Sequence, residues 1–243
     1  MTFAPQFTGT LNSTLSVTDA DPSSPQLVAL TGTGLADITT ITSTPSTLNY
    51  GNVVWGLNST KTVIVKNSGS ANSTIGAFTF GGSPDYTQTN NCPSTLAPAA
   101  TCTVTVTFAP NALGALNGSL SFADNTSAGS STITLTGTGK TSITVSPYAL
   151  TFGNQKVGTS SAAKTITFTN ASNAIALAIS LSGADQQDWT YTTTCKAIVP
   201  ANGSCTVSVT FTPQVAGSLS ANVVFTDADP SGPQITAMTG SGS

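Results

Sequence analysis

Cys205-Thr206-Val207-Ser208-Val209-Thr210-Phe211-Thr212-Pro213 is the stretch of sequence that decides the fold. Apolar residues alternate with hydroxyl-bearing residues along it, so its apolar side chains share one face, and this period of two predicts a half-buried β-strand. Nearly the same text stands earlier as Cys102-Thr103-Val104-Thr105-Val106-Thr107-Phe108-Ala109-Pro110, and its tail stands again as Thr2-Phe3-Ala4-Pro5. The chain is therefore predicted to be a repeat protein.

The composition favours strands throughout the chain. Of the 243 residues 38% are hydrophobic and only 6% are charged, while Ser, Thr, Asn and Gly take most of the polar positions. Thr is frequent in strands, whereas Ser, Asn and Gly are frequent in turns. The length suffices for two domains that each bury a core. We therefore expect an all-β fold.

The repeats place the domain boundaries. Without gaps, Thr2–Gly34 is identical to Thr210–Gly242 at 18 of 33 positions, so residues 1–34 are predicted to be the C-terminal strand pair of an incomplete repeat. Residues 35–139 and 140–243 are each predicted to form a seven-stranded immunoglobulin-like sandwich, because short strands and turn signals follow in the same order in both. An isolated hairpin is marginal in water, so the N-terminal pair should dock on another surface or fray.

A family resemblance rests on a frame of short motifs in the second repeat. The frame comprises Pro147-Tyr148-Ala149-Leu150-Thr151-Phe152-Gly153, Thr169-Asn170, Asn202-Gly203-Ser204-Cys205-Thr206-Val207 and Thr210-Phe211-Thr212-Pro213. It resembles the abnormal-spindle/hydin type of immunoglobulin-like domain and, in bacteria, the tandem repeats of secreted choice-of-anchor D proteins. The resemblance covers both complete repeats and the N-terminal remnant. It implies a seven-stranded sandwich with a structural or binding role and no catalytic residues.

Four cysteines form two local pairs with the same spacing. Cys92 and Cys102 are ten positions apart, as are Cys195 and Cys205, and each pair has the same place in its repeat. Such pairs in a small all-β chain favour disulfides and hence an oxidising compartment. Zinc is the alternative, but neither pair has a second CxxC motif or a histidine to complete four ligands.

The residue types that are absent exclude several functions. The sequence has no His, Arg or Glu, and its charged groups are nine Asp and six Lys with a net charge of −3. Acid–base chemistry near neutral pH depends mostly on His or a tuned Glu, and bidentate phosphate recognition depends on Arg. The negative net charge also argues against nucleic acid, whose affinity comes mainly from cationic contacts to phosphate. We expect neither an enzyme nor a nucleic-acid-binding protein, and we expect no cofactor. No apolar run is long enough to span a bilayer.

Two features are weak candidates for ligand sites. The pairs Asp19/Asp21 and Asp227/Asp229 place oxygens on loops, as calcium requires, but an Asx-stabilised turn before a proline explains the same residues. Trp55 has no aromatic counterpart in the second repeat, which makes it the best single candidate for a surface contact with a ligand. Partial burial or a contact between the domains is the alternative.

These observations predict a non-catalytic extracellular or cell-surface protein that spaces, adheres or assembles. Its partner would be another copy of itself or another cell-surface component. The apolar residues of the orphan strands could add to a sheet edge and build a fibre or a head-to-tail oligomer; they are Phe3, Leu11, Leu15, Val17, Val28 and Leu30. The alternative is a carbohydrate-binding accessory module of a larger secreted protein.

The beginning of the chain suggests a piece of a longer array. Met1 falls inside a strand that the repeats predict, and no secretion signal precedes it. We expect either a fragment or a reading frame begun at an internal methionine.

Overall fold

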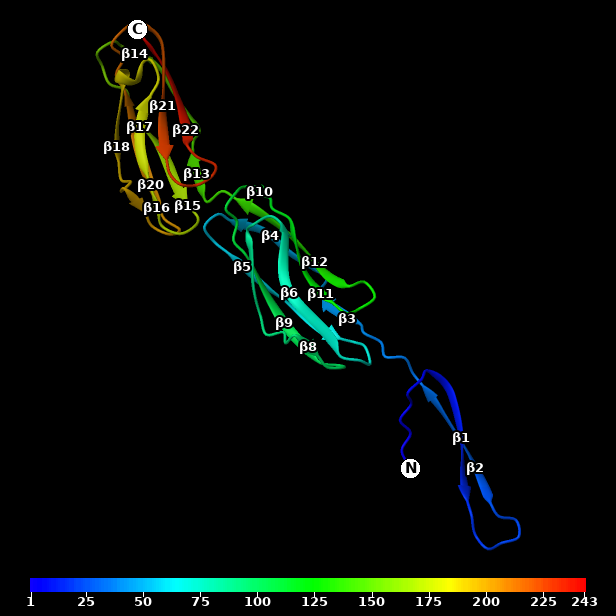
Figure 1. Ribbon diagram of the computed structural model, residues 1–243. Coiled ribbons are helices and arrows are strands. Elements are labelled where there is room, and N and C mark those ends of the chain that lie inside the picture. The colour runs from blue at the N-terminus through cyan, green and yellow to red at the C-terminus, as the bar shows by residue number, and fades with distance from the viewer.

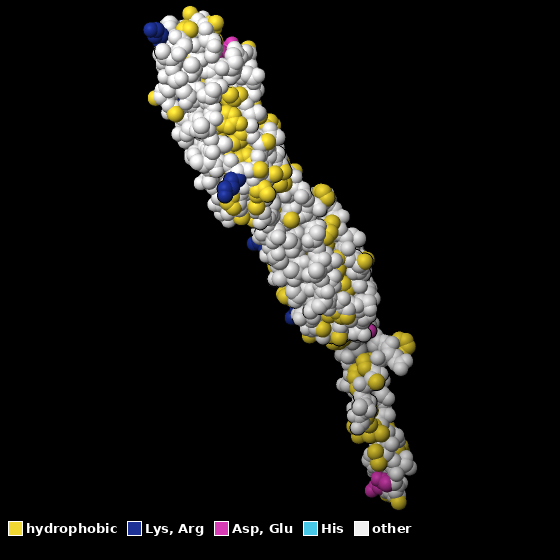
Figure 2. All heavy atoms as spheres, turned by 90° about the vertical axis from the view of Figure 1, so that its left-hand side faces the viewer, with side chains coloured by type: hydrophobic (Ala, Val, Ile, Leu, Met, Phe, Trp, Pro, Cys, Tyr) yellow, Lys and Arg dark blue, Asp and Glu magenta, His cyan; other side chains and the backbone are white.

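A computed structural model describes residues 1–243 and shows three β units in a row along one direction (Figure 1). The predicted all-β class is confirmed, since the single helical element is the short 3-10 turn Gln186–Asp188. None of the helical structure is long and apolar enough to cross a membrane. Few charged side chains lie on the face seen in Figure 2.

The N-terminal unit is a two-stranded hairpin that stands apart from the rest of the chain (Figure 1). Its strands are β1 (Gly9–Val17) and β2 (Gln26–Gly34), which pair antiparallel over their full length, from Gly9 opposite Gly34 to Val17 opposite Gln26. We call residues 1–34 the N-terminal hairpin. The strand-period alternation of Leu11, Leu15 and Val17 sends these side chains to one face.

Unit 1 contains the strands from β3 to β12. They are β3 (Ile41–Thr44), β4 (Thr47–Val54), β5 (Ser59–Asn67), β6 (Ser73–Gly82), β7 (Tyr86–Asn90), β8 (Thr95–Leu96), β9 (Thr101–Phe108), β10 (Gly114–Ala115), β11 (Gly118–Asp124) and β12 (Ser130–Lys140). One sheet has the order β3-β5-β9-β7. The other has the order β10-β12-β11-β6-β8, with β4 added in parallel to β12. The two sheets form a sandwich around one core.

Unit 2 repeats this architecture. Its strands are β13 (Ile143–Ser146), β14 (Ala149–Gln155), β15 (Lys164–Asn170), β16 (Ile175–Ala176), β17 (Ala178–Ser182), β18 (Trp189–Thr193), β19 (Ile198–Val199), β20 (Ser204–Phe211), β21 (Gly217–Thr226) and β22 (Gln234–Gly242). The sheets run β13-β15-β20-β18 and β14-β22-β21-β17, and β16 pairs with β19. The strand that decides the fold, β20, lies inside its sheet, between β15 and β18.

The first strand of each sandwich is divided between the two sheets. In unit 2 it is divided at Pro147 into β13, which belongs to one sheet, and β14, which belongs to the other. Pro45 divides β3 from β4 in the same way. Proline has no backbone N–H and cannot continue a hydrogen-bonded ladder, so the chain leaves one sheet there and joins the facing one.

Each unit has its own hydrophobic core, built from the alternating side chains of both sheets. The core cluster of unit 2 has 17 buried residues and that of unit 1 has 16. The Trp189 ring stacks on Phe211 with 4.6 Å between centroids, and in unit 1 Tyr86 stacks on Phe108 at 4.9 Å. Trp189 and Tyr86 therefore have equivalent packing roles. Burying one such ring contributes about 1.5–3 kcal/mol.

A phenylalanine packed against a glycine recurs in all three units. A Cβ atom built on Gly240 would lie 2.5 Å from the Phe211 ring, and one on Gly137 would lie 2.5 Å from Phe108. In the N-terminal hairpin a Cβ on Gly32 would lie 2.5 Å from Phe3. Only glycine allows this close approach of a ring to the strand. The N-terminal hairpin therefore has, with two strands, the same contact of a ring with a glycine as units 1 and 2.

Candidate functional site

The N-terminal hairpin exposes a face that is buried in the complete units. Phe3 is 57% exposed, and Val17 and Val28 are about half exposed. Their equivalents in unit 2 are Phe211, Phe225 and Thr236, each with 0% exposure. We call Phe3, Leu11, Leu15, Val17, Val28 and Leu30 the open face. An apolar sheet face of this kind is typical of an interaction surface.

The open face includes a groove where the N-terminal segment folds back over the strands. Its volume is about 610 Å³, and its lining includes Phe3, Leu11 and Leu30. The edge of β2 beside it has no neighbouring strand, because β2 pairs with β1 alone. Unpaired backbone N–H and C=O groups along such an edge can bind another strand. The N-terminal hairpin thus has both an exposed apolar face and a strand edge with unpaired backbone groups.

Trp55 lies at the joint between unit 1 and unit 2. Its half-buried side chain packs against the core cluster of unit 2. Its backbone N–H donates to the carbonyl oxygen of Lys140 (2.8 Å), and its own carbonyl oxygen accepts from Ser172 Oγ (2.7 Å). Asn173 Nδ2 donates to the carbonyl oxygen of Gly56. The structure thus places Trp55 in a contact between domains.

The aromatic residues do not form a platform on which sugar rings could stack. Trp189 is 2% exposed and Tyr86 is 4% exposed, because both belong to cores. The hydroxyl of Tyr50 donates to the carbonyl oxygen of Val106 inside unit 1, and desolvation by burial raises the pKa of this phenol. Tyr148 is the one widely exposed Tyr or Trp, at 66%. A carbohydrate module of the kind that aligned aromatic residues predict finds no support in this arrangement.

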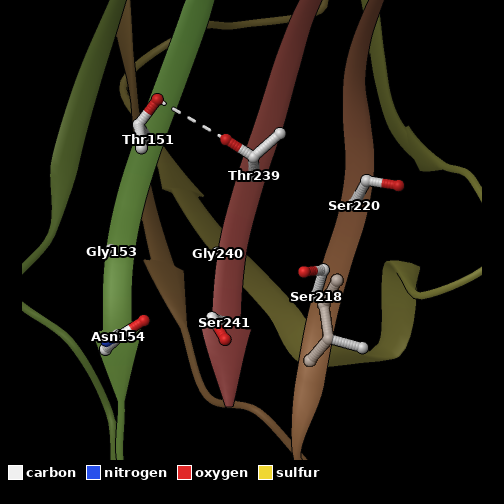
Figure 3. A pocket seen from close by; sticks show the side chains of 9 residues that line it. Thr151, Gly153, Asn154, Ser218, Ser220, Thr239, Gly240 and Ser241 are labelled. Atoms are coloured by element: carbon white, nitrogen blue, oxygen red, sulfur yellow. Dashed lines mark hydrogen bonds between the residues drawn. The ribbon is translucent and has the colours of Figure 1, made fainter.

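A shallow polar groove lies on the sheet β14-β22-β21 of unit 2 (Figure 3). Its volume is about 410 Å³, and Thr151, Thr239 and Ser241 turn their hydroxyls toward it, with 3.5 Å between the hydroxyls of Thr151 and Thr239. No titratable group lines this groove. Activated hydroxyl nucleophiles need a base within hydrogen-bond reach. The groove can therefore donate and accept hydrogen bonds, but it lacks a base that would activate a hydroxyl.

The two aspartate pairs accept hydrogen bonds within turns, and Asp229 also binds Ser142 at the start of unit 2. Asp229 Oδ2 accepts from Ser142 N and from Ser142 Oγ, both at 2.7 Å, and Oδ1 accepts from Ser231. Asp21 accepts the equivalent bond from Ser23 but has no counterpart of Ser142. The structure contains no cluster of three or more side chains suited to hold a metal ion. At least one oxygen of each carboxylate therefore accepts a turn or strand-start hydrogen bond, while Asp227 Oδ2 is buried without a partner.

The hydrogen bonds around Asp229 determine how its carboxyl group titrates. Burial alone raises its pKa, but the hydrogen bonds from Ser231 and Ser142 outweigh desolvation and lower the pKa below the usual value. Asp227 lies two residues before Asp229 and is partly buried. Desolvation and the charge of Asp229 raise the pKa of Asp227 above its usual value. As the pH falls, protonation of Asp229 therefore disfavours the folded state, whereas protonation of Asp227 favours it.

Replacing Asp229 with Asn should lower the free energy of unfolding of unit 2 by about 1–3 kcal/mol at neutral pH, because Ser142 loses a charged acceptor. A lowered folded-state pKa means that this contribution is complete above the unfolded value of about 4 and is lost as the pH falls through the folded value. The difference between wild type and D229N in urea unfolding should therefore shrink below about pH 4. D21N, in the exposed equivalent turn, is the control and should change nothing; a pH-independent difference contradicts the prediction.

Both disulfides are present and close equivalent loops. Cys92–Cys102 and Cys195–Cys205 each have 4.9 Å between Cα atoms, and no free cysteine remains. Each bridge links the residues just after β7 or β18 to β9 or β20, with the short strand β8 or β19 between the two cysteines. Two disulfides indicate an oxidising environment.

Two family models match the chain. Residues 38–140 match the model described as Cep192 domain 4, and residues 141–235 match the model described as abnormal spindle-like microcephaly-associated, ASPM-SPD-2-Hydin, abbreviated ASH. These matches support the assignment of both sandwiches to the ASH type of immunoglobulin-like domain. Domains of this type are generally not enzymes. No curated protein matches the sequence.

The comparison with solved structures found matches of low similarity. A protein of unknown function from Porphyromonas gingivalis W83 is 11% identical, with a TM-score of 0.36 and coverage of 83% of this chain and 99% of that chain. The ASH/PapD-like domain 7 of human CEP192 is 14% identical, with a TM-score of 0.34 and coverage of 42% and 85%. The secreted serine protease VesC of Vibrio cholerae is 14% identical, with a TM-score of 0.34 and coverage of 68% and 45%. At these TM-scores the likenesses carry no functional argument.

The joint residues are the part of the site that sequence reasoning missed. Ser172 and Asn173 lie in a polar loop, 117 positions from the carbonyl groups of Trp55 and Gly56 to which they donate. Neither residue has a periodic or motif signal. The one available signal was the short connection between the two repeats, which predicts limited freedom without naming contacts.

Proposed function

We propose that this chain is a non-catalytic extracellular structural protein, a rod of immunoglobulin-like domains that associates with other copies through its N-terminal hairpin. The two disulfides and the resemblance to secreted bacterial repeats support the extracellular assignment. The short joint between unit 1 and unit 2, held by hydrogen bonds from Ser172 and Asn173, supports a spacing role. Only 6% of the residues are charged, so few charged side chains prevent strand edges and sheet faces of different molecules from associating.

The observation that carries the proposal is the open face. Its residues are equivalent to buried residues of unit 2 but are more exposed in the N-terminal hairpin, and it adjoins an unpaired edge of β2. A two-stranded hairpin gains stability when further strands or another surface cover its apolar side. Association with another copy supplies that cover.

Deleting residues 1–34 should abolish self-association, because the deletion removes the open face and the free edge together. Sedimentation velocity over a range of concentrations should show larger species for the full chain and a monomer for the truncated chain. The matched variant is L27D, since Leu27 is 66% exposed on the opposite face of β2 and should leave association intact. A monomeric full chain at every concentration contradicts the proposal.

A further inference from the structure

The strand that completes the N-terminal hairpin can be derived from the two complete units. In unit 2, β22 is equivalent to β2 and lies between β21 and β14. In unit 1, β12 likewise lies between β11 and β4. In both units the strand on the far edge is parallel to the last strand. The free edge of β2 corresponds to the edge that β4 and β14 occupy.

The register of this parallel pair is the same in both units. Leu48 lies opposite Leu135, and Leu150 lies opposite Met238. In each case the register then shifts by one residue at a glycine, Gly51 with φ 64° or Gly153 with φ 69°. These positive φ values are costly for other residues.

The other free edge, that of β1, is less well defined. Its equivalents are β11 and β21, which pair with β6 and β17. The β11–β6 pair has an irregularity between Phe122 and Asp124, whereas the β21–β17 pair has none. The two units therefore agree on the register shift of the partner of β2, and they differ in the regularity of the ladder that the partner of β1 forms.

The side chains of β4 and β14 fit the residues that the N-terminal hairpin leaves uncovered. Tyr50 packs on Phe108 with 5.5 Å between centroids, and Phe152 packs on Phe211 at 5.8 Å. Phe3 is the equivalent of these phenylalanines, as its place over Gly32 shows. By the same equivalence, the leucine of an added strand would lie opposite Leu30 in β2, and its glycine would lie at the shift beside Thr31–Thr33.

We propose that the free edge of β2 binds, in parallel, a β-strand with the pattern Leu-x-Phe/Tyr-Gly-Asn, supplied by another repeat of the same type that releases it from its own sheet, where β4 and β14 are otherwise paired with β12 and β22. The pattern is that of Leu48–Asn52 and Leu150–Asn154. The leucine covers Leu30, the aromatic ring covers Phe3, and the glycine forms the register shift. A third strand also takes the hairpin beyond the two-stranded limit of stability. This inference rests on the proposed function, because it names the occupant of the same site.

The test uses a fluorescein-labelled peptide of residues 146–156, which contains the β14 pattern, titrated with the full chain at concentrations below those of self-association. Fluorescence anisotropy should show saturable binding that is lost when residues 1–34 are deleted. Changing Leu150→Asp in the peptide, or Leu30→Asp in the chain, should weaken binding by about tenfold or more, since a buried apolar contact is lost. Gly153→Val in the peptide should also weaken binding, whereas L27D in the chain should not.

The direction of the strand has its own readout. A nitroxide at the N-terminus of the peptide should broaden the amide signals of β2 near its start at Gln26, and one at the C-terminus should broaden those near Gly34. The proposal is overturned by absent binding, by equal binding of the Leu150→Asp peptide or of the chain without residues 1–34, or by the reverse broadening. Self-association that depends on residues 1–34 without peptide binding retains the proposed function and removes this inference. Peptide binding by a chain that never self-associates contradicts the proposed function and retains this inference.

Discussion

Replacing Phe211 with Ala should destabilise unit 2 by about 3–5 kcal/mol, which is the usual cost of deleting a buried aromatic ring. Phe211 has 0% exposure, stacks on Trp189 and packs directly against Gly240. The residue that faces the ring on β22 is a glycine, which has no side chain to fill the space. Calorimetry should resolve the unfolding of the two sandwiches and show the transition of unit 2 at a much lower temperature.

The repeat supplies both a parallel experiment and a control for this prediction. F108A should lower the stability of unit 1 by a similar amount, since Phe108 packs against Gly137 in the same way. F7A should have no effect on either sandwich, because Phe7 is 76% exposed in the N-terminal hairpin. A loss below about 1 kcal/mol for F211A would show that the core readily collapses around the cavity.

Removing the disulfide of unit 2 by the double substitution C195A/C205A should lower its free energy of unfolding by about 2.5–3 kcal/mol. The estimate comes from the entropy of closing a loop of about eleven residues in the unfolded chain. Equilibrium unfolding in urea measures the change. The substitution C92A/C102A should have a similar effect on unit 1, because the sequence separation is the same.

Two outcomes would contradict the disulfide prediction. One is an unchanged unfolding midpoint for C195A/C205A. The other is the detection of free thiols in native wild-type protein, since all four cysteines are bridged in the structure. Urea unfolding tests the first outcome, and intact mass with and without reductant tests the second.

The strands were predictable because their signal is local. The alternation in Cys205–Phe211 is sufficient to identify β20 and its buried face, and the repeat transfers that result to β9. The division of the first strand was not predicted, although Pro147 and Pro45 are visible in the sequence. A proline shows where a ladder must stop, but the sheet that the chain joins next depends on which edge is free.

The aspartate pairs show where local sequence ceases to be informative. Asp19-Ala20-Asp21 and Asp227-Ala228-Asp229 are identical in sequence. Asp21 is exposed, whereas Asp229 is 4% exposed and accepts hydrogen bonds from Ser142 at the start of unit 2. The turn follows from neighbouring residues, but the burial follows from a strand start 87 positions away.

The parallel pairing of β14 with β22 also determines how unit 2 would respond to a pulling force along the rod. The chain enters the pair at Ala149 and leaves it at Gly242, and because the strands are parallel these points lie at opposite ends of the ladder. Tension would therefore shear the pair lengthwise, and its hydrogen bonds would share the load and rupture together. In the N-terminal hairpin the antiparallel strands meet at Gly9 and Gly34, so a force applied there would open the ladder one bond at a time.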